Sequence, residues 1–379
     1  MRILAFFIHS SEYGKIIRGS ERRFLEISKH LRDLGVDVYA LEYAPSLAEM
    51  WNTYSYHPLK VKRRFKNHSL LSMLYLVLYG VIFCIKYKCD IIYLPNHRPC
   101  GFSPYESVVP AYIVSRLCRK PLVIVFHHLL YVDASERNPF QSLAYRQAEV
   151  CIAVSQATAN DIKKHFKIKR VVINGNGVDL NQFKAFRSKA KLYDAVYLGR
   201  ISESKGIYTL IKAWKIVTNK LPSAQLLIVG GSEKNVDGSV RALLRELKLE
   251  RNVILTGFVS DDEKIQLLKL SRLFIFPSNA EGFGMAVVEA MACGLPCIIS
   301  DVPALKENFD QTAIFVKPGD TEGFSDAVLG LLFDPNRYNK LKSQTQRFIE
   351  RFASEFTWKK VARKEIEICT RIINKIGSQ

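Results

Sequence analysis

Two glutamates, Glu281 and Glu289, have seven residues between them in the stretch SNAEGFGMAVVEAMACGLPCIISD. The first lies in a turn after the strand-like run FIFPS, and the second lies in an apolar run with helical spacing. If the whole span were helical, roughly 12 Å would separate them. The carboxylate pairs of glycoside hydrolases are closer, at about 5 to 9.5 Å. The spacing instead suits a long ligand with a diol at each end, such as a nucleotide sugar, because carboxylates accept paired hydrogen bonds.

A Gly-Phe-Gly turn, formed by Gly282, Phe283 and Gly284, precedes the predicted helix. The backbone N–H groups at a helix N-terminus have no partner within the helix, so they offer a site for a phosphate or for sugar hydroxyls. Glycine also lets a ligand approach the backbone closely. The turn therefore predicts a binding site between the two glutamates.

Two cations, Arg200 and Lys205, follow the strand-like run DAVYLG in the stretch GRISESKG. Arginine can contact two phosphate oxygens at once and lysine offers a compact charge, so the two could neutralise a diphosphate. A surface loop with ordinary charges is the alternative. The chain lacks the GxxxxGK[ST] sequence of P-loop proteins, and IVGGSEKN falls short of GxGxxG. These absences disfavour a P-loop NTPase and an enzyme with a nicotinamide cofactor.

Short apolar runs alternate with amphipathic helical patterns along the whole chain. The predicted strands are RILAFFI, VDVYALE, DIIYLP, PLVIVFH, EVCIAVS and RVVING in the first half, and DAVYLGR, AQLLIVGG, NVILTGF, RLFIFPS, PCIISD and AIFVKP in the second. This alternation predicts α/β architecture, with parallel sheets covered by helices on both faces. Two sets of six strands predict two Rossmann-like doubly wound domains, in which ligands bind beyond the carboxyl ends of the strands.

A polar, basic stretch between about Gln182 and Lys191 separates the two sets of strands. A chain of 379 residues is also too long for one ordinary core. We therefore predict an N-terminal domain over residues 1–185 and a C-terminal domain over residues 186–357. The last segment, residues 358–379, has the pattern of an amphipathic helix, and we predict that it packs on the N-terminal domain.

One segment, Ser69–Ile85, contains no charged residue and is at the short limit for a membrane-spanning helix. Basic residues flank both of its ends, so they indicate no orientation in a membrane. Its aliphatic residues repeat at helical spacing, at Leu70, Leu74, Val77, Leu78, Val81, Ile82 and Ile85. We predict a buried crossover helix, and membrane insertion is the alternative.

The chain carries a net charge of +19, which predicts an anionic partner such as a nucleic acid, an acidic membrane or a phosphorylated substrate. A soluble protein with a lysine-rich surface is the alternative. The basic residues concentrate in Gly14–Arg32 and Lys60–Lys66. The eight cysteines form no Cys-x-x-Cys pair, and the N-terminus resembles a first strand rather than a signal peptide. We therefore predict a reduced, cytoplasmic location.

Together, these motifs resemble the retaining family 4 glycosyltransferases with the GT-B fold. The segment with the two glutamates carries most of the resemblance, and ISES-KG, LLIVGG and VILTGFV precede it in the family's order. VSQATANDIKKHF and INGNGVDLNQF resemble motifs near the family's linker. The resemblance covers nearly the whole chain and implies two domains that face each other across a cleft. It also implies transfer of a hexose-type sugar from a UDP- or GDP-sugar to a glycan or lipid-linked acceptor.

The resemblance implies a role for each motif residue. Glu281 would bind the hydroxyls of the donor sugar and Glu289 those of the ribose, while Arg200 and Lys205 would bind the diphosphate. Further donor contacts are implied for the backbone of Gly282, Phe283 and Gly284, and contacts near the base for Phe258 and Val259. The family usually needs no metal, and the sequence has no Asp-x-Asp motif or compact His/Asp cluster, so we expect no metal and no other cofactor.

Two motifs of the first half depart from the family's pattern. His127 stands where the family often has a histidine that faces the donor sugar, so the resemblance implies a catalytic contact there. The next residue is His128 where the family has aspartate, which leaves the choice between the two histidines open. The stretch KIIRGSER has Gly19 and Ser20 in place of a Gly-Gly pair, and a phosphate contact at Gly19 is expected.

Two other function classes compete with a transferase. Non-hydrolysing epimerases of nucleotide sugars share the architecture and would isomerise the donor without an acceptor. A nucleic-acid-binding protein is supported only by the charge, because the sequence has no zinc finger and no RNA-binding aromatic signature. We expect no nucleic acid and instead an anionic cytoplasmic membrane, which the cluster Lys60–Lys66 would contact as a peripheral docking site.

Overall fold

The computed structural model describes residues 1–7, 19–42, 57–60, 70–97, 108–127, 139–183, 191–233 and 236–377. The chain forms two compact units. The first contains Met1–Gly177 and Phe356–Gln379, and the second contains Val178–Glu355. The predicted boundary at 185/186 compares with 177/178 in the structure, and residues 185 and 186 lie outside the described residues. The predicted boundary at 357/358 compares with 355/356.

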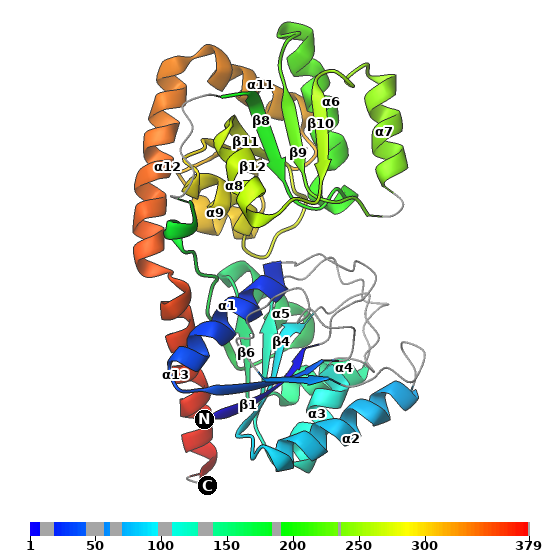
Figure 1. The fold of residues 1–379 in the computed structure, drawn as a ribbon, viewed down its shortest axis with the longest axis vertical. Helices are drawn as coiled ribbons and strands as arrows, with labels where there is room; N and C mark the ends of the chain where they lie inside the picture. The colour runs from blue at the N-terminus through cyan, green and yellow to red at the C-terminus, as the bar shows by residue number, and fades with distance from the viewer. Residues whose placement is uncertain are drawn as a thin grey trace. The chain divides into compact units, whose positions relative to one another are not determined.

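Seven parallel strands form the sheet of the first unit, in the order β3-β2-β1-β4-β5-β6-β7 (Figure 1). They are β1 (Arg2–Phe7), β2 (Asp37–Glu42), β3 (His57–Lys60), β4 (Ile91–His97), β5 (Leu122–Phe126), β6 (Val150–Ala153) and β7 (Val171–Ile173). The prediction of six strands is wrong for this unit, because it omits β3. This strand has four residues and includes a proline, a composition that suits the edge position where it pairs with β2.

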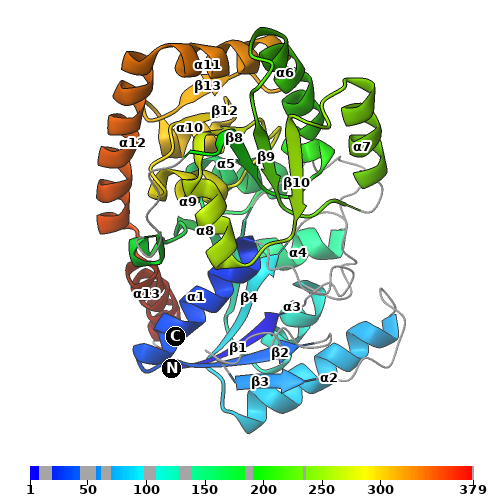
Figure 2. The ribbon, with the colours of Figure 1, turned by 45° about the horizontal axis from the view of Figure 1, so that its top comes forward.

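Helices cover the sheet of the first unit on both faces. They are α1 (Gly19–Asp33), α2 (Leu70–Lys86), α3 (Val108–Leu117), α4 (Pro139–Gln147), α5 (Gln156–Phe166) and α13 (Trp358–Gly377). Connections between parallel strands are right-handed, so the reversal of strand order at β1 puts α1 on one face and α2 to α5 on the other. The C-terminal α13 packs along α1, whereas α2 packs on α3 and α3 on α4 (Figure 2).

Helix α2 is a crossover helix, as predicted, but the prediction that it is buried holds for only one of its sides. Its buried residues are Ser72, Leu76, Gly80 and Cys84. A side chain at Gly80 would overlap Val114 of α3 and Phe6 of β1, so the helix approaches the sheet closely. The aliphatic residues Leu70, Leu74, Leu78, Ile82 and Ile85 are instead exposed. Among the helices in the described ranges, none is long and apolar enough to cross a membrane.

A buried polar network holds α13 on the first unit. The guanidinium of Arg23 in α1 faces the carboxylate of Glu365 in α13, with Nη2 2.8 Å from Oε2, and both side chains are 1% exposed. The side-chain amide of Asn174 donates to Glu365 Oε2 at 2.6 Å, and the hydroxyl of Tyr93 donates to Oε1. Gly177 lies so close to the backbone of Trp358 that a Cβ there would overlap it. This network joins α13 to α1, β4 and the segment after β7.

Six parallel strands form the sheet of the second unit, in the order β10-β9-β8-β11-β12-β13. They are β8 (Tyr193–Leu198), β9 (Leu226–Val229), β10 (Val253–Gly257), β11 (Ser271–Phe276), β12 (Cys297–Ser300) and β13 (Ile314–Val316). All six correspond to predicted runs. The central strands β9, β11 and β12 have almost entirely buried side chains, because helices cover both faces.

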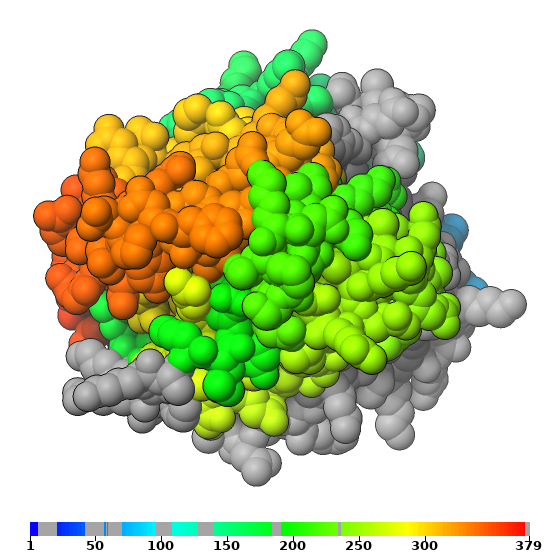
Figure 3. Space-filling model, turned by 90° about the horizontal axis from the view of Figure 1, so that it is seen from above, coloured from blue at the N-terminus to red at the C-terminus, as the bar shows by residue number. Residues whose placement is uncertain are grey.

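The helices of the second unit follow the strands in regular alternation. They are α6 (Ile207–Lys220), α7 (Asp237–Glu246), α8 (Asp261–Lys269), α9 (Met285–Ala292), α10 (Pro303–Phe309), α11 (Thr321–Phe333) and α12 (Pro335–Glu355), with 3₁₀ turns η5 (Leu180–Phe183) and η6 (Glu203–Lys205). Helices α6 and α11 pack against each other, and Figure 3 shows them adjoining on the surface of this unit. Each unit therefore has the predicted doubly wound α/β architecture.

Candidate active site

Two loops meet at the carboxyl edge of the second sheet, where adjacent parallel strands β8 and β11 end. The backbone N–H of Asn279, after β11, donates to the carbonyl of Ser204 at 3.0 Å, and its side-chain amide donates to the carbonyl of Glu203 at 3.1 Å. Gly206 has φ of +71° and lies so close to Pro277 that a Cβ would overlap its carbonyl. Glycine at this position therefore lets the loop with Lys205 lie directly against the loop with Glu281.

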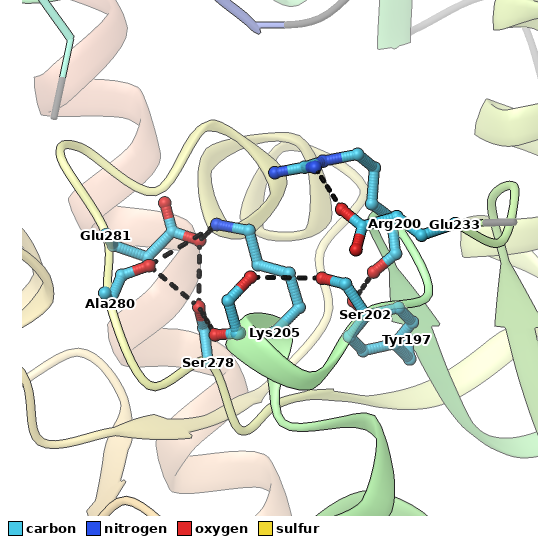
Figure 4. Close-up of polar contacts among 9 residues, drawn as sticks. Tyr197, Arg200, Ser202, Lys205, Glu233, Ser278, Ala280 and Glu281 are labelled. Atoms are coloured by element: carbon cyan, nitrogen blue, oxygen red, sulfur yellow. Dashed lines mark hydrogen bonds and ion pairs between the residues drawn. The ribbon is translucent and has the colours of Figure 1, made fainter. Parts of the chain in front are cut away.

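Lys205 and Glu281 form an ion pair across these two loops (Figure 4). The ammonium of Lys205 lies 2.5 Å from Glu281 Oε1, and the side chains are 18% and 12% exposed. The buried hydroxyl of Ser278 lies 3.2 Å from the same carboxylate oxygen and 3.0 Å from the carbonyl of Ala280. The structure thus brings together a sequence-predicted sugar ligand and a sequence-predicted phosphate ligand, and adds Ser278 as a third group.

Arg200 extends from the same connection between β8 and α6 and pairs with a different carboxylate. Its Nη1 lies 2.5 Å from Oε1 of Glu233, which follows β9 (Figure 4). The hydroxyl of Tyr197 donates to the carbonyl of Arg200 at 2.6 Å. Burial raises the pKa of Tyr197, so its hydroxyl stays protonated and continues to hold this backbone in place. Both cations predicted to bind the diphosphate therefore already have a carboxylate partner.

Sequence reasoning missed Glu233. It lies in IVGGSEKN, a stretch considered only for its glycines. The signal that could have identified it is its place directly after a predicted strand, at the same sheet edge as Arg200. Because β9 lies beside β8, the two connections necessarily come close to each other.

The second glutamate, Glu289, belongs to a separate buried pair. It lies in α9, is 8% exposed, and its Oε1 is 3.0 Å from the ammonium of Lys264 in α8. The same ammonium lies 2.8 Å from Asp261 Oδ1. Helix α8 begins with a capping box in which Ser260 and Glu263 bond to each other's backbone N–H groups, and this fixes the turn that carries Lys264. Sequence reasoning missed Lys264 as well.

The Gly-Phe-Gly turn is built as a helix start. Gly284 is the N-cap of α9 with φ of +94°, and a Cβ there would lie 2.5 Å from Leu305. Phe283 is buried and its ring packs on Phe352 of α12, with centroids 6.2 Å apart. Asn308 donates to the carbonyl of Phe283 at 2.9 Å. The side chain of Phe283 therefore anchors the turn in the core, which leaves only backbone groups of the turn for a ligand.

Phe258 and Val259 follow β10 at the same sheet edge. The Phe258 side chain is 56% exposed, and its ring covers Gly231, where a Cβ would overlap it. An exposed aromatic ring with one face held by backbone suits stacking against a planar base. Val259 is half-buried beside it.

The predicted residues of the first unit lie at its own carboxyl edge. His127 follows β5 and is 8% exposed, and its Nε2 lies 2.9 Å from the carbonyl of Pro95 at the end of β4. A carbonyl only accepts, so Nε2 donates and carries a hydrogen. Gly19 is the first residue of α1, and the side chain of Ser20 and all of His128 lie outside the described residues. In the described part of the chain, no group of three or more His, Cys, Asp or Glu side chains could hold a metal ion.

Two family models match the chain and together span nearly all of it. Residues 17–182 match the model described as Glycosyltransferase Family 4. Residues 178–348 match the model described as Glycosyl transferases group 1. The second match contains every candidate residue of the second unit, and the first contains Gly19 and His127.

Curated relatives include two enzymes of sugar transfer. The chain is 25% identical over 258 residues to a GDP-mannose:cellobiosyl-diphosphopolyprenol alpha-mannosyltransferase of Xanthomonas campestris, an alignment that spans 65% of this chain and 67% of the relative. It is 27% identical over 259 residues to mannosylfructose-phosphate synthase of Agrobacterium fabrum, which spans 62% of this chain and 56% of that protein.

Solved structures match over the full chain. HepE of Anabaena in complex with UDP has a TM-score of 0.79 at 22% identity, with 98% of this chain and 100% of that chain covered. Sucrose-phosphate synthase from Thermosynechococcus elongatus also has a TM-score of 0.79, at 18% identity and 99% coverage of both chains. At these identities the likeness concerns the fold, which is the GT-B fold. The chain therefore belongs to the glycosyltransferases that the family 4 and group 1 models describe.

Proposed function

We propose that the protein is a retaining glycosyltransferase that moves a hexose-type sugar from a UDP- or GDP-sugar to a hydroxyl of a glycan or lipid-linked acceptor. The observation that carries the proposal is the ion pair of Lys205 with Glu281, beside Arg200 at the same sheet edge. Cations for a diphosphate and a carboxylate for sugar hydroxyls thus lie next to each other. The GDP-mannose in one relative's name and the UDP bound to HepE support this donor class.

The donor would lie along the carboxyl edge of the second sheet. Glu281 would accept hydrogen bonds from the sugar hydroxyls, and Arg200 and Lys205 would contact the diphosphate. Glu289 would bind the ribose, and the base would stack near Phe258 and Val259. The backbone N–H groups of the turn Gly282–Gly284 would add donors for the sugar and the adjacent phosphate.

The transfer step breaks the bond between the anomeric carbon and the diphosphate oxygen, and the electron pair goes to that oxygen. The acceptor hydroxyl forms the new bond from the same face of the sugar, and its proton passes to the leaving diphosphate. Arg200 and Lys205 stabilise the negative charge that develops there, so no metal is needed. In the first unit, we propose that the acceptor binds, that Gly19 contacts a phosphate and that His127 makes a catalytic contact.

We propose that the acceptor is lipid-linked and that the reaction takes place at the cytoplasmic face of an anionic membrane. The cellobiosyl-diphosphopolyprenol in one relative's name supports this acceptor class. The basic cluster Lys60–Lys66 is the sequence-predicted docking site, and its side chains lie outside the described residues.

Proton NMR of slow donor hydrolysis tests the reaction class. UDP- and GDP-hexoses with an α-linkage are incubated with the protein in EDTA, and the first free sugar is assigned from the coupling constant of its anomeric proton. If the configuration is retained, the α-anomer should appear first. The Glu281→Gln variant should release no free sugar. The β-anomer would contradict retention, and an isomerised nucleotide sugar would favour an epimerase.

A further inference from the structure

We propose that helices α2, α3 and α4 form a surface that inserts into the interface of an anionic lipid bilayer. The inference rests on the proposed function and deepens it, because a transferase with a lipid-linked acceptor has to contact the membrane. The surface itself is remote in sequence from the donor-site residues. The surface consists of apolar side chains on α2, which we call the α2 stripe, and of a basic rim on all three helices.

The α2 stripe is narrow, long and exposed. Leu71, Leu74, Leu78, Ile82 and Ile85 are between 45% and 68% exposed. At 100° per residue these five positions fall within roughly 80° of the helix circumference, and they extend over about 21 Å. The opposite side of the helix packs on the protein through Ser72, Leu76, Gly80 and Cys84. A helix that is apolar on both sides needs apolar surroundings on both sides.

The neighbouring helices also expose apolar residues. Leu117 at the end of α3 is 64% exposed, and Leu143 of α4 is 41% exposed. Helix α2 packs on α3 and α3 packs on α4, on the face of the sheet opposite α1 and α13. Soluble monomers seldom expose large apolar surfaces, and a surface of this kind indicates a protein or membrane contact.

The charges of these helices select an anionic bilayer as the partner. Helices α2, α3 and α4 contain no aspartate or glutamate. Their exposed charged residues are the cations Lys86, Lys88, Arg116, Arg119 and Arg146, at or just beyond the helix ends. Glu106 before α3 and Glu136 before α4 lie outside the described residues. Asp90 after α2 and Glu149 after α4 accept the backbone N–H groups of Arg2 and Leu122. Cations around an apolar stripe match the negative headgroups around an acyl interior.

A second copy of the chain fits this surface less well. A two-fold contact brings the same patch of both copies together, so the cations of one rim would face those of the other. Like charges across an interface oppose association. Helix α2 has 17 residues and is not long and apolar enough to cross a membrane. The stripe lies in the plane of the bilayer surface.

Flotation of the full chain with phosphatidylglycerol/phosphatidylcholine vesicles tests the proposal. The triple variant Leu74→Ser/Leu78→Ser/Ile82→Ser should lower the partition coefficient by at least about tenfold. The matched control, Leu192→Ser/Ile254→Ser/Phe333→Ser, replaces exposed apolar residues of the second unit and should bind as wild type does. Each substitution Lys86→Gln or Arg119→Gln should weaken binding about fivefold on anionic vesicles and little on neutral ones.

A tryptophan placed in the stripe separates insertion from surface adsorption. In Leu78→Trp, the emission should shift to shorter wavelength when vesicles are added, and brominated acyl chains should quench it. Absence of vesicle binding by the wild type, equal binding by both triple variants, or unshifted emission would each overturn the proposal. So would a wild-type dimer that the α2 variant converts to monomers, because the stripe would then be a protein interface.

Donor binding provides the independent readout. The α2 triple variant should bind its nucleotide sugar as the wild type does, because the replaced residues lie outside the donor site. Vesicle binding without any donor binding would contradict the proposed function and leave the membrane surface standing. Donor binding without vesicle binding would contradict the membrane surface and leave the proposed function standing.

Discussion

The ammonium of Lys205 lies 2.5 Å from a carboxylate oxygen of Glu281, although 76 positions separate the two residues in the chain. A similar pair joins Arg200 to Glu233. The cations that would bind the diphosphate are therefore paired with carboxylates. A donor has to replace these contacts: its phosphates take over the cations, and its sugar hydroxyls take over Glu281.

The two glutamates of the opening motif should differ in what they recognise. Glu281→Gln should lower sugar transfer about 10²- to 10³-fold, because its proposed contact is with the sugar. The affinity for free UDP or GDP should stay equal or become tighter, since Lys205 then loses its competing partner. Glu289→Gln should weaken the free nucleotide and the donor alike, because its proposed contact is with the ribose. Calorimetric titration with the nucleotide alone and with the donor separates the roles. Equal loss of nucleotide affinity in both variants would contradict the assignment.

Arg200 and Glu233 should have opposite effects on donor affinity. Arg200→Ala should weaken donor binding about 10- to 100-fold, because it removes a charged hydrogen-bond donor to phosphate. Glu233→Gln should leave binding equal or tighter, since Arg200 then loses its competing partner. Dissociation constants of the two variants check this prediction. A loss in Glu233→Gln as large as that in Arg200→Ala would show that Glu233 positions Arg200 rather than competing for it.

The buried pair of Arg23 and Glu365 should control the stability of the first unit. Arg23→Met should lower the free energy of unfolding by about 3–5 kcal/mol, because it leaves the carboxylate of Glu365 buried without its cation. The double variant Arg23→Met/Glu365→Leu should recover a large part of this loss.

The matched control is Glu367→Gln on the same helix, whose side chain is 64% exposed and should change stability by less than about 0.5 kcal/mol. Urea unfolding followed by circular dichroism measures all three variants. If Arg23→Met were as stable as the control, α13 would not depend on this network.

Two cysteines should resist alkylation in the folded protein. Burial, with a hydrogen bond to Cys84, raises the pKa of Cys118 to about 12, and burial raises the pKa of Cys293 to about 12. Because the thiolate is the reactive form, both should remain unmodified by iodoacetamide at pH 8 and react after unfolding. Peptide mass mapping before and after urea checks this. Rapid modification of either thiol in the native protein would contradict it.

The sequence predicts the strands well because buried parallel strands are short apolar runs between turn signals. It fails for β3, whose four residues carry too little pattern. It also fails to predict which side of α2 is buried, because periodicity shows that leucines share a face but not which face packs. The small residues Ser72 and Gly80 allow close approach to the sheet, and this packing decides the orientation.

The candidate site is predictable where a motif is local in sequence. Glu281, the turn after it and Lys205 were identified from their own neighbourhoods. Glu233 and Lys264 were not, because their partners Arg200 and Glu289 lie 33 and 25 positions away and meet them only through the order of strands and helices. Contacts of this kind depend on the fold, which composition and spacing do not determine residue by residue.

Calorimetric titration of the metal-free protein with UDP-, GDP- and ADP-hexoses is the direct test of the proposed donor site. One nucleotide series should bind in EDTA, and Arg200→Ala should weaken this binding about 10- to 100-fold. Glu281→Gln should reduce the part of the affinity that the sugar contributes. Absence of binding by every donor, or binding that neither substitution changes, would contradict the assignment of this sheet edge as the donor site.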